Sequence, residues 1–112
     1  MAYSMCLTIC HRTAEETPMF ILSLTYLKSN DEADKVMEPH LAWVATGYEK
    51  GWFVASGRKV PRTGGIIFAK GERADLAAYV AIDPFTLHGI ASYEITEIAL
   101  TKTIEGLELL KG

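Results

Sequence analysis

Hydrophobic and polar residues alternate with a period of two along residues 19–27, and this alternation predicts a β-strand. One face of that strand is wholly apolar, and it carries Phe20, Leu22, Leu24 and Tyr26. Three later segments are also rich in β-branched and aromatic residues and are bounded by turn-forming residues. We expect them to be strands at residues 53–57, 66–70 and 93–100.

The first long helix is expected to begin at Pro39, because a proline in the first turn fixes φ without the loss of an intrahelical hydrogen bond. Its apolar residues recur at offsets of three, four, seven and eleven, the spacing of a single buried stripe. That stripe comprises Leu41, Val44, Ala45, Tyr48 and Trp52. Gly51 is expected to end the helix. A short helical turn over residues 31–35, capped by Ser29 or Asn30, is expected before it.

A second long helix is expected after Gly71, with a buried side at positions i, i+3, i+4 and i+7. The residues of that side are Leu76, Tyr79, Val80 and Asp83. Pro84 disfavours helical dihedral angles at Asp83, so the helix should end there. We expect a loop over residues 85–91, and a short helix or tail over residues 103–110.

The predicted order is strand, helix, strand, strand, helix, strand, which is typical of an α+β fold of the split βαβ type. Such a fold has a four-stranded antiparallel sheet with both helices on one face. The other face of the sheet would then expose the apolar side chains of Ile21, Leu27, Ile98 and Leu100. Because a large exposed apolar face is unfavourable in a monomer, we expect a homodimer in which two sheets stack.

The chain has 112 residues, which is the length of a single domain. We expect a poorly ordered N-terminal extension over residues 1–18, a folded domain over 19–101 and a tail over 102–112. The net charge is −3 and the longest basic run is Arg58-Lys59, so nucleic acid is not an expected partner. No apolar run approaches the roughly 20 residues that span a bilayer, so a membrane is not an expected partner either.

The two cysteines, Cys6 and Cys10, both lie near the amino terminus and cannot form a disulfide framework for the domain. With His11 they offer three zinc ligands, but a structural zinc site needs four, so we expect no metal. The opening residues lack the features of a secretory signal, and we expect a cytoplasmic protein. Because ordered patterning begins at Met19 rather than Met1, we hypothesise that Met19 is the functional start, which the intact mass of the native protein would test.

His40 and Asp83 are the candidate catalytic pair. Histidine has an ordinary pKa near 6.5 and serves well as a general acid or base, and a carboxylate can fix its tautomer. Asp83 is expected at a helix carboxyl end, where the negative pole of the helix dipole favours a cationic or donating partner. The same residues also suit structural roles, since aspartate before proline is common in turns and a histidine near a helix start can cap or pack.

Other candidates would contact a substrate. Ser56 and Gly57 follow a strand, where a hydroxyl and backbone N–H groups can hold an oxygen atom, although this pair also suits a simple turn. Arg58 belongs to a cationic loop that can attract an anionic or phenolate-like ligand, or simply be solvated. The remaining candidate substrate contacts are Trp43, Phe85 and His88. Trp43 at helical spacing equally suits the core, and His88 equally suits the surface.

No glycine-rich phosphate loop and no dinucleotide fingerprint occurs in the sequence. No histidine follows His88, so an axial haem ligand near the carboxyl end is also lacking. A serine hydrolase is disfavoured because the sequence has no G-x-S-x-G elbow. We therefore expect no cofactor.

Five short segments, in this order, resemble the YciI-like (YCII-related) family over Met19 to about Leu100. They are Pro39-His40-Leu41, Ala55-Ser56-Gly57, Gly64-Gly65-Ile66, Asp83-Pro84-Phe85 and Ala91-Ser92-Tyr93-Glu94-Ile95. The resemblance implies a ferredoxin-like βαββαβ fold that forms a dimeric α+β barrel, related to muconolactone-isomerase-like proteins. It also implies a histidine–aspartate pair in a pocket, at His40 and Asp83. The sequence departs from many relatives at Arg58-Lys59, where they carry proline and apolar residues.

Two functions fit these features. The first is a cofactor-independent enzyme in which His40 moves a proton and Asp83 orients it, as in an isomerisation or elimination on a small cyclic or phenolic compound. The second is a dimeric module that binds a small molecule without turnover. The sequence does not name the substrate.

Overall fold

The computed structural model describes residues 17–111, and the expectations for the extension before residue 17 lie outside this range. Four strands and four helices follow one another, and a 3-10 turn closes the chain at Glu108–Leu110. Their bounds are β1 Met19–Tyr26, α1 Asn30–Lys35, α2 Met37–Glu49, β2 Phe53–Arg58, β3 Gly64–Lys70, α3 Arg73–Ala81, α4 Pro84–Leu87 and β4 Ala91–Ile98.

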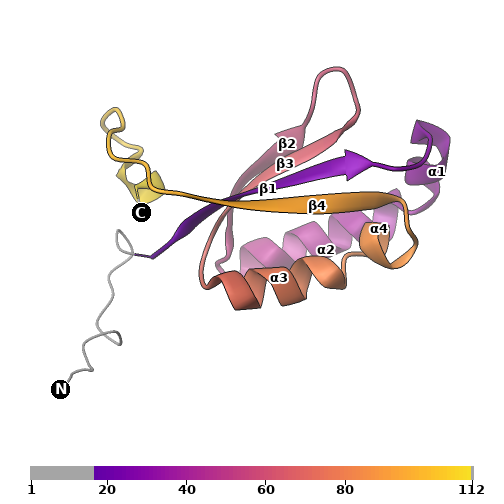
Figure 1. Cartoon of the computed structure of the whole chain (residues 1–112), viewed down its shortest axis with the longest axis horizontal. Helices are drawn as coiled ribbons and strands as arrows, with labels where there is room; N and C mark the ends of the chain where they lie inside the picture. Colours follow the sequence, from indigo (N-terminus) through magenta and orange to yellow (C-terminus); the bar gives the residue numbers. More distant parts are fainter. Residues whose placement is uncertain (1–16, 112) are drawn as a thin grey trace.

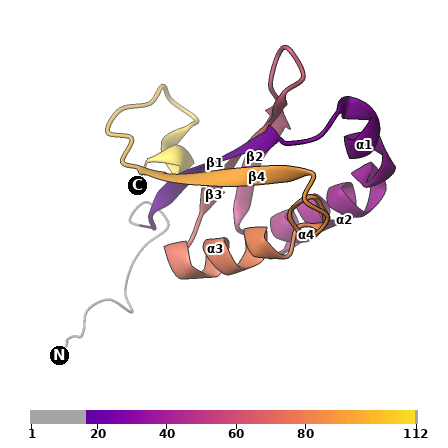
Figure 2. The same ribbon diagram turned by 45° about the vertical axis from the view of Figure 1, so that its right-hand side comes forward.

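The strands form one antiparallel sheet in the order β2-β3-β1-β4, and α2, α3 and α4 lie on one side of it (Figure 1). The turned view shows the same two layers, with α1 at one end of the sheet (Figure 2). An α+β fold with a four-stranded antiparallel sheet is therefore confirmed. The strand order is compatible with a ferredoxin-like fold.

The predicted alternation in β1 is confirmed. Phe20, Leu22 and Leu24 are each at most 4% exposed and face the helices. Leu22 pairs with Ile67 on β3 and with Ile95 on β4, so the apolar face continues across the sheet. This face forms the floor of the hydrophobic core.

The stripe predicted for α2 is wrong in part, although its members Val44 and Trp52 pack against the core. The helix ends at Glu49, and it buries Trp43 and Gly47 rather than Leu41 or Tyr48, which are 55% and 40% exposed. Two hydrogen bonds between α2 and α3 accompany this orientation of α2. The Tyr79 hydroxyl donates to the Trp43 carbonyl over 2.7 Å, and the Trp43 indole donates to the Tyr79 carbonyl over 3.1 Å. Their rings stack 4.7 Å apart, which turns the Trp43 face of the helix inward.

The second long helix also ends earlier than expected. α3 ends at Ala81, although its buried residues Leu76, Tyr79 and Val80 match the predicted side. Asp83 has ψ of 131° and caps the short helix α4, so the expected loop over 85–91 was wrong in its first half. Asp83 therefore lies at a helix amino terminus, where the dipole favours a carboxylate instead of opposing it.

Two strands begin earlier than expected, β3 at Gly64 and β4 at Ala91. Gly64 pairs with Thr25 in the ladder, and a Cβ atom there would collide with the carbonyl oxygen of Leu24. Glycine is therefore required at this position by close backbone approach, and the Gly64-Gly65 pair belongs to the sheet rather than to the turn.

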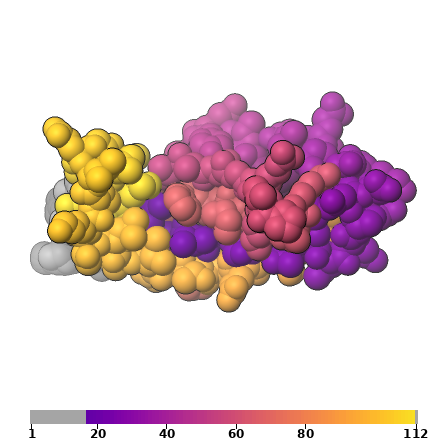
Figure 3. Space-filling view, turned by 90° about the horizontal axis from the view of Figure 1, so that it is seen from above, coloured from indigo at the N-terminus to yellow at the C-terminus, as the bar shows by residue number. Residues whose placement is uncertain are grey.

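The sheet face turned away from the helices is seen from above in Figure 3, with the C-terminal tail over one end. Lys70 is 6% exposed, and its ammonium donates to the carbonyls of Leu109 and Lys111 at 2.7 and 3.0 Å, which holds the tail there. Ile21 and Ile98 on this face are half-buried in the single chain. The homodimer stays a prediction.

Candidate functional site

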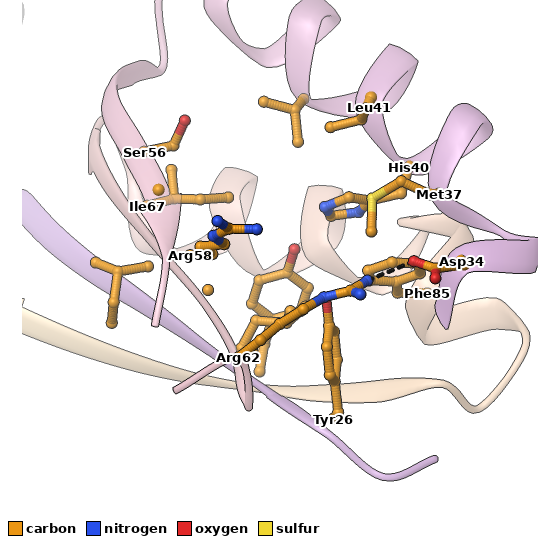
Figure 4. Close-up of a pocket in the computed structure, with 17 residues that line it drawn as sticks. Tyr26, Asp34, Met37, His40, Leu41, Ser56, Arg58, Arg62, Ile67 and Phe85 are labelled. Carbon is orange, nitrogen blue, oxygen red and sulfur yellow. Dashed lines mark hydrogen bonds and ion pairs between the residues drawn. The ribbon is translucent and has the colours of Figure 1, made fainter. Parts of the chain in front are cut away.

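A cavity of about 480 Å³ lies between α2 and the β2–β3 hairpin, and its floor is formed by β1, β4 and α4. This size suits a small organic ligand. Figure 4 shows its two walls, with His40 and Leu41 on the helix side and Ser56 and Arg58 on the strand side. Most of the other lining side chains are apolar or aromatic, including Leu24, Met37, Val44, Ile66, Ile67, Phe85 and Tyr93.

His40 is held at the rigid start of α2. The helix begins at Met37, so Pro39 lies in the first turn, where a missing N–H costs no intrahelical hydrogen bond. The backbone N–H of His40 donates to the carbonyl of Val36 over 3.1 Å, which fixes the residue in the helix. The helix therefore begins two residues before the expected start at Pro39, and His40 lies at its first turn.

Asp83 is fully buried and lies between α3 and α4. Its Oδ1 accepts the backbone N–H of Phe85 over 3.0 Å, which is the N-cap hydrogen bond of α4. Pro84 at the first position of that helix fixes the turn. A buried carboxylate needs donors on every side, and the other donors come from His40 and Tyr93.

The His40 Nδ1 atom lies 2.9 Å from Oδ1 and 3.0 Å from Oδ2 of Asp83. Because a carboxylate can only accept, Nδ1 carries the hydrogen, and Nε2 of the neutral ring keeps its lone pair. The His40 side chain is 12% exposed and lines the cavity. Nε2 is therefore not bonded to Asp83, and the carboxylate lies behind the ring at Nδ1.

Tyr93 on β4 completes this network and was missed as a site residue by sequence reasoning. Its hydroxyl donates to Asp83 Oδ2 over 2.7 Å, and its ring lines the cavity. Burial raises the pKa of Tyr93, and the negative charge of Asp83 and the hydrogen bond to it raise that pKa further. The phenol is thus a permanent donor at neutral pH. Its helix-facing position in the β4 alternation was the signal available in the sequence.

Phe85 holds the imidazole from one side. The two rings are stacked with centroids 4.0 Å apart and planes 4° apart. Tyr26 meets the Phe85 ring edge-on at 5.8 Å and also lines the cavity. These contacts restrict rotation of the His40 ring, so the direction of Nε2 is fixed by packing as well as by Asp83.

Ser56, Gly57 and Arg58 line the opposite wall of the cavity. Ser56 and Arg58 share the helix-facing side of β2, since they pair with Ile67 and Gly65 on β3. The Ser56 hydroxyl forms a hydrogen bond with the Tyr48 hydroxyl at 2.8 Å.

An ion pair between α1 and the hairpin loop was not foreseen. Arg62 donates to Asp34 over 2.6 Å, drawn as a dashed line in Figure 4, and its guanidinium lies 5.6 Å from the centre of the Tyr26 ring. The carboxylate of Asp34 raises the pKa of Arg62. Both charged residues line the cavity, so their charges cancel locally.

Two predicted contacts are not brought into the cavity. Trp43 is 7% exposed and lies in the core, and it is not among the lining residues. His88 is exposed at the carboxyl end of α4, also outside the lining. The short α4 helix, absent from the prediction, carries His88 away from the cavity.

Within residues 17–111, no group of three histidine, cysteine, aspartate or glutamate side chains is placed to hold a metal ion. The spacing of Cys6, Cys10 and His11 lies outside the described residues. In the same part of the chain, none of the helices has the length and apolar character needed to cross a membrane.

The fold and the site define a small α+β domain with a buried histidine–aspartate pair beside an apolar cavity. The model of the YCII-related domain matches residues 19–99, and the chain belongs to this family. No curated protein matches the sequence.

Proposed function

We propose that this protein is a small enzyme that needs no cofactor and moves a proton on a small organic molecule. The observation that carries the proposal is the bond from His40 Nδ1 to the fully buried Asp83, which leaves Nε2 on the cavity side. The substrate would have an acidic C–H or O–H group and enter the cavity between α2 and the hairpin.

In the proposed reaction, Nε2 of His40 takes a proton from a substrate C–H bond next to a carbonyl group, and the electron pair of that bond moves toward the carbonyl oxygen to form an enolate. Asp83 stabilises the imidazolium that forms. The proton then returns to a different atom in an isomerisation, or a leaving group departs with the electron pair in an elimination. No oxidant or reductant is required.

The surroundings of the pair support this role. Phe85 stacks on the imidazole, and Tyr93 and the Phe85 backbone satisfy the remaining acceptor sites of Asp83. A base held this rigidly needs little reorganisation before proton transfer.

Hydrogen exchange in heavy water tests the proposal without knowledge of the product. Small cyclic ketones, lactones and phenols are incubated with the protein in D2O, and loss of their acidic C–H signals is followed by proton NMR. We expect exchange with the wild type and its loss in His40→Gln. The matched control is His88→Gln, which removes an exposed imidazole outside the cavity and should leave exchange unchanged.

Exchange that survives in a folded His40→Gln variant would remove His40 from the mechanism. Ligands that bind equally to the wild type and to this variant, with no exchange in either, would favour a small-molecule-binding module instead.

A further inference from the structure

We propose that the ligand of this cavity is a small monoanion with a planar carboxylate, and that Arg58 binds that carboxylate opposite His40. The inference names the substrate class of the same cavity, and it rests on the proposed function only for the chemistry at His40. Arg58 is the last residue of β2, and both residues line the cavity.

The backbone directs the Arg58 side chain to the cavity side. Arg58 pairs with Gly65 in the β2–β3 ladder, on the helix-facing side of the sheet. Glycine at this partner position has no side chain to cover the guanidinium. Gly57 and Gly64 also line the cavity.

The charged side chains that line the cavity are Asp34, Arg58 and Arg62, so the lining carries one more positive than negative charge. Arg62 is paired with Asp34. Asp83 lies behind the neutral His40 ring, outside the lining, and its carboxylate accepts hydrogen bonds from His40, Tyr93 and the Phe85 backbone. No hydrogen bond, ion pair or ring contact joins the Arg58 guanidinium to another residue within 17–111. Arg58 is therefore a solvent-exposed cation at the edge of a largely apolar cavity, with no paired side chain in the described part of the chain.

A guanidinium fork matches the two oxygens of a carboxylate, and it binds them in one plane. One uncompensated cation balances one negative charge, so a monoanion fits better than a dianionic phosphate ester. The aromatic rings of Tyr26, Phe85 and Tyr93 line the cavity, and they offer flat surfaces to an unsaturated or aromatic body. Figure 4 shows Arg58 and His40 reaching into the same space from opposite walls.

Lys59 provides a matched control because the strand alternation sends it to the other side of the sheet. Its ammonium donates to the Thr25 hydroxyl over 3.3 Å, and Lys59 does not line the cavity. Arg58→Gln and Lys59→Gln therefore remove the same charge from adjacent positions. Only the first removes it from the cavity.

The test compares benzoate with benzamide, two probes of the same shape that differ in charge. Binding to the full chain is followed by NMR shifts of the His40 ring. We expect the wild type to prefer benzoate and inorganic phosphate to compete weakly. Arg58→Gln should weaken benzoate binding by roughly tenfold or more and leave benzamide unchanged. Lys59→Gln should change benzoate affinity less than about twofold at moderate salt, and Arg58→Lys should restore part of it.

Equal affinity of the wild type for the two probes, or binding of neither, would overturn the inference. An equal loss of benzoate affinity in Arg58→Gln and Lys59→Gln would also overturn it, because only the long-range electrostatic field would then matter. Stronger binding of phosphate than of benzoate would overturn it as well. The proposed function fails separately. Carboxylate selectivity without His40-dependent hydrogen exchange would support the anion site at Arg58 and refute the proposed enzyme activity. Hydrogen exchange without carboxylate selectivity would support the enzyme activity and refute the anion site.

Discussion

His40 and Asp83 are joined by a hydrogen bond of 2.9 Å, although 43 residues separate them in the sequence. The bond connects the start of α2 to the turn between α3 and α4. The same carboxylate caps α4, so one buried group serves the proposed chemistry and the local fold together.

Asp83→Asn should lower both stability and activity. The amide NH2 of asparagine replaces a carboxylate oxygen that now accepts a hydrogen bond from His40 or Tyr93. Two hydrogen-bond donors would then face each other in a buried position. We expect a loss of about 1–3 kcal/mol in the free energy of unfolding, measured with urea, and a fall in hydrogen exchange of about 100-fold or more.

Asp34→Asn is the matched control for that experiment. It removes the same charge from an exposed pair with Arg62, and pairs of this kind contribute only about 0.2–1 kcal/mol. If Asp83→Asn lowered the free energy of unfolding no more than Asp34→Asn does, the buried hydrogen bonds of Asp83 would not contribute to stability.

Tyr93 should make stability fall at alkaline pH. Its pKa is raised by burial and by Asp83, so above about pH 10 the unfolded chain loses a proton that the folded chain keeps. Stability is therefore highest below that pH and falls by up to about 1.4 kcal/mol per pH unit for this group. Urea unfolding at pH 9, 10 and 11 measures the slope.

Tyr93→Phe should be less stable than the wild type by about 1–2 kcal/mol at neutral pH, because Asp83 loses a donor. Its decline above pH 10 should be shallower than that of the wild type. An identical alkaline slope in the two proteins would show that Tyr93 titrates normally.

The sequence was sufficient to predict the strands, because period-two alternation is a local signal. The pairing of His40 with Asp83 was implied by the family resemblance, since the expected position of Asp83 at a helix carboxyl end was wrong. The sequence was insufficient for the orientation of α2. That orientation depends on the hydrogen bonds between Trp43 and Tyr79, which join separate helices. The Arg62–Asp34 pair depends in the same way on the tertiary positions of a loop and a helix.

Gly47→Ala should destabilise the protein, against the usual trend for helices. In an exposed helix this change adds about 0.5–1 kcal/mol of stability. Here a Cβ atom would collide with the ring of Phe53. Displacing a buried ring costs about 1–3 kcal/mol, so the melting temperature should fall. A higher melting temperature would contradict the close packing of α2 on β2.

The open face of the sheet should form a homodimer interface. Light scattering at micromolar concentration is expected to give about twice the mass of one chain. Phe68 pairs with Ile21 and Ala55 on this face, and Phe68→Glu should give a monomer. Ile82→Glu changes an exposed residue of the helical layer and should remain dimeric. A monomeric wild type would refute the stacked sheets.

The tautomer of His40 is the most direct test of the central claim, that Asp83 directs a free Nε2 lone pair into the cavity. It is read from the nitrogen shifts of the ring in long-range proton–nitrogen NMR spectra, at a pH where the ring is neutral. We predict hydrogen on Nδ1 and a bare Nε2 in the wild type, and a mixture of tautomers in Asp83→Asn. Hydrogen on Nε2 with a bare Nδ1 in the wild type would contradict the account.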